Sequence, residues 1–269
     1  MSGKQFPVEF VYQVFSLLIA FIIVHGAYVT VIRPQADLFL EQEKQQMAAD
    51  PQYEQQRNFY VVVRDYEQEA CFVLMFWALA ILGFKGVSVY RQQRLLDRDL
   101  LQLPAGLPVG VEDTAELAKR MDELPEKNRA YLLPRALRTA IQRFAATRNV
   151  QDSATSLRNV CESEGERLES ELSTIRYIAW AIPSVGFIGT VRGIGAALSQ
   201  ANKAVEGDIT GVTQSLGVAF NSTFIALVIS IVLMFFIHQL QLMQERLVLD
   251  SESYGDLHLI SRLRVLPPV

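Results

Sequence analysis

The chain has 269 residues, of which 50% are hydrophobic, and it carries a formal net charge of −4 at pH 7. This slightly acidic balance gives no sign of nucleic-acid binding, because proteins that bind nucleic acid gather lysine and arginine on one face. The two cysteines, Cys71 and Cys161, and the three histidines are scattered along the chain, so we expect no disulfide, no metal site and no bound cofactor.

Four apolar runs dominate the sequence, at about residues 10–32, 70–90, 178–199 and 216–240. Each contains roughly the twenty residues that an α-helix needs to cross a hydrocarbon core about 30 Å thick. The sequence therefore predicts an all-α polytopic membrane protein with four transmembrane helices in a lipid bilayer. We expect the third and fourth spans to be extended by long cytoplasmic helices.

The first run belongs to a predicted N-terminal transmembrane helix at residues 1–32. It is longer than a signal-peptide core and no cleavage site closes it, so we expect it to be retained. It contains His25, which is either a titrating group in the membrane or a side chain that reaches interfacial water. Residues 33–69 are polar and break clearly at Asp50-Pro51. We expect a periplasmic helical hairpin there, which docks a partner or acts as a solvated spacer.

The second transmembrane helix is predicted at residues 70–90, and arginines follow it directly at positions 91, 94 and 98. Positive charge beside a span marks its cytoplasmic end. With four spans, this rule places both termini and residues 91–177 in the cytoplasm. Residues 33–69 and the turn at 201–213 then face outward.

Residues 91–177 are predicted to form a cytoplasmic helical domain. A linker rich in proline and glycine at 103–110 precedes helical patterns at 114–124 and 125–147. The second pattern carries one apolar face, made of Leu132, Ala136, Ala140 and Phe144. A charged stretch at 153–176 then runs into the third span with no strong breaker before Pro183, so we expect one long helix.

After the fourth span, residues 241–269 are expected to form a cytoplasmic C-terminal helix whose order weakens at Gly255 and Pro267-Pro268. Neither this segment nor the rest of the chain carries a phosphate-binding glycine loop or a nucleophile with a neighbouring base in sequence. We therefore expect that the chain is not an enzyme.

The predicted channel-forming helix pair at 178–240 carries small and hydroxyl-bearing residues at steps of three and four, which places each set on one helical face. The third span contributes Gly186, Gly189, Thr190, Gly193 and Ala197, and the fourth contributes Ala219, Ser222, Thr223, Ala226 and Ser230. Small residues let helix backbones approach closely, and hydroxyl groups in a membrane bond another helix, an ion or water. Simple helix packing is the plainer interpretation.

The pattern Pro183-x-x-Gly186-x-x-Gly189-Thr190-Val191-x-Gly193-Ile194, followed by Ala219-x-x-x-Thr223-x-x-x-Leu227-x-x-x-Ile231, resembles the paired signature of the MotA/TolQ/ExbB proton-channel family. The resemblance covers roughly residues 155–240 and is strongest to the TolQ/ExbB branch. The sequence departs from the family pattern at four positions: Ala226 replaces the usual Gly, Val218 a frequent Glu and Val232 the usual Pro, while Arg192 is unexpected within the first motif.

The third and fourth spans contain no Asp or Glu, although proton transport needs a titratable group at membrane depth. The candidate ion-pathway residues are Thr190, Asn221, Ser222 and Thr223. Their side chains can solvate an ion or bond a carboxylate, but they cannot carry the change of charge. The carboxylate must therefore belong to a partner.

The resemblance implies what that partner is. In such families a ring of five subunits encloses two copies of a single-span ExbD/TolR-like protein whose membrane Asp carries the proton. The resemblance thus implies a homopentameric stator subunit of the bacterial inner membrane, which converts proton motive force into mechanical work on the cell envelope. It leaves open whether the work is protein transport or another process, and whether the ion is a proton or sodium. The alternative is a non-conducting scaffold that oligomerises through its small-residue faces.

Arg192 points away from Thr190 on a helical projection, and an arginine within a membrane is costly unless it is paired. We expect it to form an ion pair outside the pore, with an acid of a neighbouring subunit. Otherwise it reaches the membrane interface or tunes the electric field along the pathway.

Overall fold

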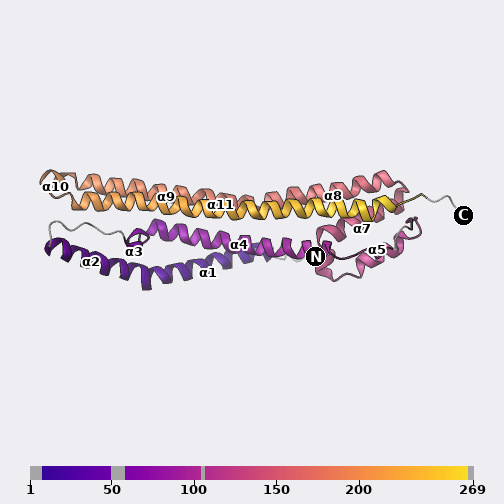
Figure 1. Ribbon diagram of the computed structural model, residues 1–269, viewed down its shortest axis with the longest axis horizontal. Helices are drawn as coiled ribbons and strands as arrows, with labels where there is room; N and C mark the ends of the chain where they lie inside the picture. Colours follow the sequence, from indigo (N-terminus) through magenta and orange to yellow (C-terminus); the bar gives the residue numbers. More distant parts are fainter. Residues whose placement is uncertain (1–7, 50–57, 104–106, 266–269) are drawn as a thin grey trace, which may run out of the picture. The chain divides into compact units, whose positions relative to one another are not determined.

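The computed structural model describes residues 8–49, 58–103 and 107–265. Within these ranges the ordered elements are helices, and the one isolated β-bridge joins Val109 to Leu263 (Figure 1). The predicted all-α class is confirmed. The elements are α1 (Val8–Ala27), π-helix η1 (Tyr28–Ile32), α2 (Arg33–Ala49), α3 (Phe59–Val62), α4 (Tyr66–Leu96), α5 (Thr114–Asp122), α6 (Glu126–Arg129), α7 (Leu132–Thr147), α8 (Val150–Glu171), α9 (Ser173–Ser199), α10 (Ala201–Val205), α11 (Thr210–His258) and the 3-10 helix η2 (Ile260–Arg262).

Four stretches of helix are long and apolar enough to cross a membrane, at Glu9–Met47, Tyr66–Leu96, Val150–Ser199 and Thr210–Arg262. Each of them contains one of the four predicted apolar runs. The prediction of four membrane-spanning helices is confirmed by their length and composition, and the chain is a multi-pass membrane protein.

The chain divides into two compact units. The first comprises residues 1–83 and 174–237, and the second comprises residues 84–173 and 238–269. Helices α4 and α11 contribute residues to both units, because each runs past a unit boundary. The first unit contains the greater part of every predicted span.

In the first unit, α1 packs along α4 through side-chain bonds to backbone carbonyls. The Tyr12 hydroxyl donates to the carbonyl of Ala80 at 3.1 Å, and Trp77 Nε1 donates to the carbonyl of Gln13 at 2.9 Å. A buried apolar cluster adds to these contacts and consists of Val24, Tyr28 and Val73. Because polar groups in lipid find few other partners, these bonds fix how α1 lies on α4.

The predicted hairpin between the first two spans is helical in its described part. Helix α2 continues α1 through the π-helix, so the first arm reaches Ala49 as expected. The second arm is not the continuous extension predicted, because α3 has only four residues and residues 63–65 separate it from α4. The Asn58 side chain caps α3 by accepting from the N–H of Tyr60 at 2.8 Å. The predicted turn at Asp50-Pro51 lies outside the described residues.

The second unit is built around the packing of α7 against α8. The predicted apolar face of α7 is buried, and it comprises Leu132, Ala136, Ala140 and Phe144. Helix α7 ends where Arg148 adopts a left-handed backbone conformation with φ of 52°. Asn149 then caps α8, since its side chain accepts from two N–H groups of the first turn. The Ser153 hydroxyl donates back to the carbonyl of Ala140 at 2.6 Å, which ties the two helices together.

The stretch that leads into the third span, residues 150–199, is helical along its length as predicted, apart from one irregular residue. Helix α8 ends at Glu171 and α9 begins at Ser173, while Pro183 lies inside α9. The residue between them, Leu172, is fully buried. Neither glycine nor proline marks this break in the sequence. The position of the break therefore depends on packing and could not be predicted from local helix propensity.

The expectation that order weakens at Gly255 is wrong. Helix α11 continues through Gly255 to His258. A Cβ atom at this glycine would lie 2.3 Å from Cδ1 of Leu157 in α8, so the missing side chain allows the two helices to pack closely. Pro267-Pro268 lie outside the described residues.

Candidate functional site

The small-residue faces of α9 and α11 lie against each other within one chain, along the stretch where Figure 1 shows the two helices side by side. Three pairs make this contact, Gly186 with Ala226, Gly189 with Ser222 and Gly193 with Ala219. Cβ atoms on the three glycines would lie 2.4, 2.5 and 2.7 Å from the Cβ atoms of their partners. The absence of side chains therefore sets the distance between the helices. We call this contact the glycine seam; Ala197 is also buried, further along α9.

Two threonine hydroxyls meet in the glycine seam. Thr190 Oγ1 and Thr223 Oγ1 are 2.5 Å apart. Thr190 Oγ1 also lies 3.0 Å from the carbonyl oxygen of Ala219, and Thr223 Oγ1 lies 3.1 Å from that of Gly186. Two hydroxyls supply two protons for these three contacts. The protons can therefore redistribute by rotation of the hydroxyls, without movement of the helices.

The other predicted polar residues have different surroundings. Ser222 is fully buried and donates to the carbonyl of Val218 in its own helix at 2.9 Å. Ser230 donates across the seam to the carbonyl of Ala179 at 3.1 Å. Asn221 instead lines a pocket of about 330 Å³ together with residues of α2, α3 and the start of α11. The structure thus brings Thr190, Thr223 and Ser222 together and places Asn221 on a different face of α11.

Arg192 forms an ion pair within the same chain. Its Nε and Nη2 donate to the two carboxylate oxygens of Glu67 in α4, at 2.6 and 2.8 Å, and Asp65 lies 3.7 Å away. Two parallel bonds of this kind fix the orientation of both groups. The acid that Arg192 contacts here belongs to α4 of the same chain, whereas an acid of a neighbouring subunit was expected.

A second charged cluster, which the sequence did not predict, lies at the start of α4. Glu69 is buried, and its carboxylate contacts His25 of α1 and Arg33 of α2. Glu67 and Glu69 are two residues apart in the first turn of the helix, so their side chains project about 160° apart. Glu67 thus reaches α9 while Glu69 reaches α1 and α2. The sequence feature that could have predicted this cluster is the pair of acids at the start of an apolar helix.

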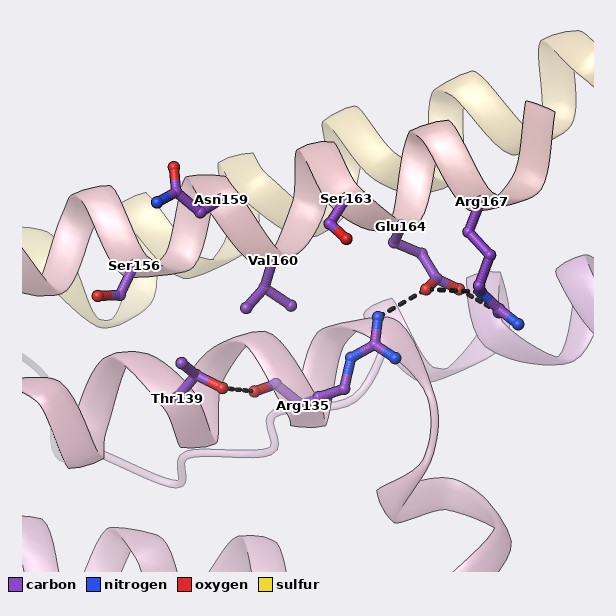
Figure 2. A pocket seen from close by; sticks show the side chains of 8 residues that line it. All are labelled: Arg135, Thr139, Ser156, Asn159, Val160, Ser163, Glu164 and Arg167. Atoms are coloured by element: carbon purple, nitrogen blue, oxygen red, sulfur yellow. Dashed lines mark hydrogen bonds and ion pairs between the residues drawn. The ribbon is translucent and has the colours of Figure 1, made fainter. Parts of the chain in front are cut away.

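A polar pocket of the second unit lies between α7 and α8 and holds Glu164 between two arginines (Figure 2). The Glu164 side chain is 4% exposed; Arg135 Nη2 donates to it at 2.6 Å, and Arg167 donates through Nη2 at 2.5 Å. Burial by itself would raise the pKa of Glu164, but the hydrogen bonds and charges of Arg167 and Arg135 outweigh it and hold the pKa below its ordinary value. This cluster is an ionised link between two helices of the second unit.

The structure also bears on metal binding. In residues 8–49, 58–103 and 107–265, no group of three or more His, Cys, Asp or Glu side chains is arranged to hold a metal ion. Cys71 and Cys161 are both buried, free thiols.

Comparison with known proteins gives one match. Residues 128–253 match the family model described as the MotA/TolQ/ExbB proton channel family. The matched range includes α7, α8, α9 and most of α11, and therefore the whole glycine seam. Members of this family are not enzymes and generally pair with partners of the ExbD/TolR/MotB type. No curated protein and no solved structure matches the chain.

Proposed function

Because residues 128–253 form a domain of the MotA/TolQ/ExbB proton channel family, which implies a stator-type proton channel subunit, we propose that the chain is the ring-forming subunit of an ion-driven motor of the TolQ/ExbB branch. In this proposal, five copies in a bacterial inner membrane surround a single-span ExbD/TolR-like partner. The partner's membrane Asp carries the proton, and the motor converts proton motive force into work on the cell envelope.

The observation that carries the proposal is the pair of threonine hydroxyls in the seam of the matched domain. Thr190 and Thr223 share three contacts with only two protons between them. Either hydroxyl can therefore turn and donate to an incoming carboxylate while the other keeps a bond to backbone. Helices α9 and α11 contain no Asp or Glu between residues 173 and 244, so in this proposal the titrating group is supplied by the partner.

The scaffold alternative assigned the small residues to contacts between copies of the chain. In the structure those residues are already packed against each other inside one chain, which leaves them unavailable for that role. Large apolar side chains instead form the exposed faces of the two helices, for example Phe187, Leu198, Phe224 and Ile231, each at least 60% exposed. These faces are suited to lipid and to neighbouring subunits.

The proposed topology has both termini in the cytoplasm. The support is the arginine cluster that ends α4, at Arg91 and Arg94, with Arg98 directly after it. Under the positive-inside rule this end of α4 is cytoplasmic. The start of α4, where Glu67 and Glu69 lie, then faces the periplasm.

The test of the proposal is proton flux in vesicles that contain the chain and its single-span partner. Thr190→Val and Thr223→Val keep the side-chain volume and remove the hydroxyl. Thr213→Val is the matched control, because its hydroxyl lies outside the glycine seam and donates to the carbonyl of Ile209, the residue just before α11. We expect flux to fall in the first two variants while assembly persists, and to be unchanged in the third.

Thr190→Ser, which restores a hydroxyl, is expected to recover flux and separates loss of chemistry from loss of packing. Unchanged flux in fully assembled Thr190→Val and Thr223→Val would remove these hydroxyls from the pathway. Absence of flux in every form, with an assembled complex, would favour a non-conducting protein. Flux that is driven by a sodium gradient and not by a proton gradient would identify sodium as the transported ion. The stator role would remain.

A further inference from the structure

A pocket of about 340 Å³ in the second unit lies where the end of α4 meets the segment that leads into α7. Four of its seven lining residues are exposed cations: Arg91 and Arg94 of α4, Arg98 just after it, and Lys127 of α6. No carboxylate of the described residues lines this pocket, which we call the arginine pocket. Four positive charges around one small cavity repel one another, so the cavity favours an anion.

The cations of the arginine pocket are not neutralised by acids of the described chain. Several other arginines of the second unit do pair with acids, namely Arg120 with Glu116, Arg135 with Glu164, Arg138 with Asp122 and Arg158 with Glu252. By contrast, the side chains of Arg91, Arg98 and Lys127 make no ion pair or hydrogen bond with a described residue. Arg94 donates to the hydroxyl of Tyr90 at 2.8 Å, which leaves its charge uncompensated.

The two walls of the arginine pocket are fixed to each other. Gln92 of α4 is 8% exposed, and its side chain accepts a hydrogen bond from the N–H of Leu132, the first residue of α7, at 3.0 Å. Leu95, which lines the pocket, is buried as well. Tyr131, another lining residue, directly precedes α7, so the positive end of that helix also lies at the pocket. The cations are therefore already gathered around the cavity before an anion arrives.

The arginine pocket lies at the end of a membrane-spanning helix. Phe84 and Val87 of α4 are apolar and 41% and 49% exposed, and Arg91 and Arg94 follow on the same face, within about 80°. Arg91 lies about 6 Å beyond Val87 along the helix axis, and Arg94 about 10 Å beyond it. The headgroup layer on each side of the hydrocarbon core is about 5–8 Å thick. The face of α4 that is apolar within the span therefore becomes cationic at the depth of the lipid headgroups.

We propose that the arginine pocket binds the phosphate group of an anionic phospholipid, whose acyl chains lie along the exposed apolar face of α4. Guanidinium groups bind phosphate through two parallel hydrogen bonds, and the ammonium of Lys127 adds a point charge. A zwitterionic phospholipid would bring its own cation next to the four already present. The pocket therefore distinguishes lipids by the net charge of the headgroup.

The test is native mass spectrometry of the full-length protein in detergent, titrated with phosphatidylglycerol or with phosphatidylcholine of the same acyl chains. The first lipid is anionic and the second is zwitterionic. We expect the wild type to bind phosphatidylglycerol more tightly. The double variant Arg98→Gln/Lys127→Gln removes two cations of the pocket and keeps the two arginines nearest the span. We expect it to bind phosphatidylglycerol roughly tenfold more weakly, or weaker still.

The matched control is Arg143→Gln/Arg246→Gln, which removes two exposed arginines of α7 and α11 outside the pocket and changes the net charge equally. We expect it to keep the affinity of the wild type. Equal affinity of the wild type for the two lipids overturns the proposal. An equal loss in both double variants also overturns it, because the attraction would then be general to the protein's charge. If Arg98→Gln/Lys127→Gln fails to fold, a smaller loss in the single variant Lys127→Gln decides.

Glycerol 3-phosphate separates a lipid from a soluble phosphate, because it carries the phosphate without acyl chains. At millimolar concentration we expect it to leave phosphatidylglycerol bound to the wild type. Displacement would assign the arginine pocket to a soluble anion and overturn the lipid assignment. These measurements need neither a partner nor ion flux, so their outcome is independent of the proposed channel function.

Discussion

Gly193 of α9 lies directly against Ala219 of α11: a Cβ atom on Gly193 would be 2.7 Å from the Cβ atom of Ala219 and 2.8 Å from its backbone nitrogen. A backbone atom cannot move aside unless its helix moves, so Gly193→Ala is expected to force the helices apart. We expect the free energy of unfolding to fall by about 1–3 kcal/mol, as for other overpacked interiors.

Gly195, two residues further along the same helix, is the matched control, because nothing lies within 4 Å of its Cβ position. Gly195→Ala is expected to be neutral or slightly stabilising, since alanine is the better helix former. The unfolding midpoints of both variants in detergent check the prediction. Equal midpoints for the two would contradict the tight contact at the glycine seam.

The ion pair between Arg192 and Glu67 predicts an asymmetric response to neutralisation. The Glu67 side chain is 12% exposed and that of Arg192 is 50% exposed. Arg192→Gln leaves a nearly buried carboxylate without its main partner, whereas Glu67→Gln leaves a guanidinium that still reaches Asp65. We expect Arg192→Gln to cost more stability, by about 1–3 kcal/mol. Unfolding midpoints of both single variants and of the double variant measure this, and a larger loss in Glu67→Gln would refute it.

The Glu164 cluster predicts a stability that falls in acid. Its pKa is lower in the folded protein than in the unfolded chain, because the hydrogen bonds from Arg167 and Arg135 outweigh burial. The ionised carboxylate therefore contributes stability that is fully present above the unfolded-state pKa, about 4.3 for glutamate, and is lost as the pH falls through the folded-state value.

The measurement is the difference in free energy of unfolding between the wild type and Glu164→Gln at several pH values. We expect this difference to be about 1–3 kcal/mol at pH 7 and to become smaller below about pH 4.3. Glu166→Gln changes an exposed acid of the same helix and is expected to show little difference at any pH. A constant difference between the wild type and Glu164→Gln would argue against an ionised Glu164.

Cys161 is expected to be inert to thiol reagents in the folded protein. It is fully buried, and burial raises the pKa of its thiol to about 12, so almost no thiolate exists at pH 7.5. Ser163→Cys places a thiol on an exposed position of the same helix and is expected to react with maleimide roughly a thousandfold faster. Mass spectrometry after timed labelling gives both rates. Rapid modification of Cys161 in the native wild type would disprove its burial.

Hydrophobic length and spacing were enough to predict the four long helices and the small-residue faces. The periodicity of Leu132, Ala136, Ala140 and Phe144 also predicted the buried face of α7, because a one-sided apolar pattern has to be covered. These features follow from the sequence alone because they depend on local composition and helical geometry.

The features that sequence missed depend on contacts between distant segments. The break at Leu172 has no glycine or proline to mark it, and Gly255 reads as a weak point although it is the place where Leu157 of α8 packs. The partner of Arg192 was expected on another subunit, because helical projection gives a direction and not the identity of the neighbouring helix. Glu69 was one of many acids in a polar stretch, and only the folded chain shows that it is buried.

The π-helix at Tyr28–Ile32 also governs which changes in chain length the first helix can accept. Buried side chains follow one stripe along the first helix, with Val24 before the π-helix, Tyr28 at its start, and Ala36 and Glu43 after it. The wide turn rotates eight residues as seven would, so deleting one residue from it would restore an ordinary α-helix and keep the orientation of everything beyond it. Ala36 and Glu43 would stay in the stripe and move only along the helix axis. The turn can therefore lose one residue at little cost, whereas inserting a further residue there would rotate everything beyond it by about 100°.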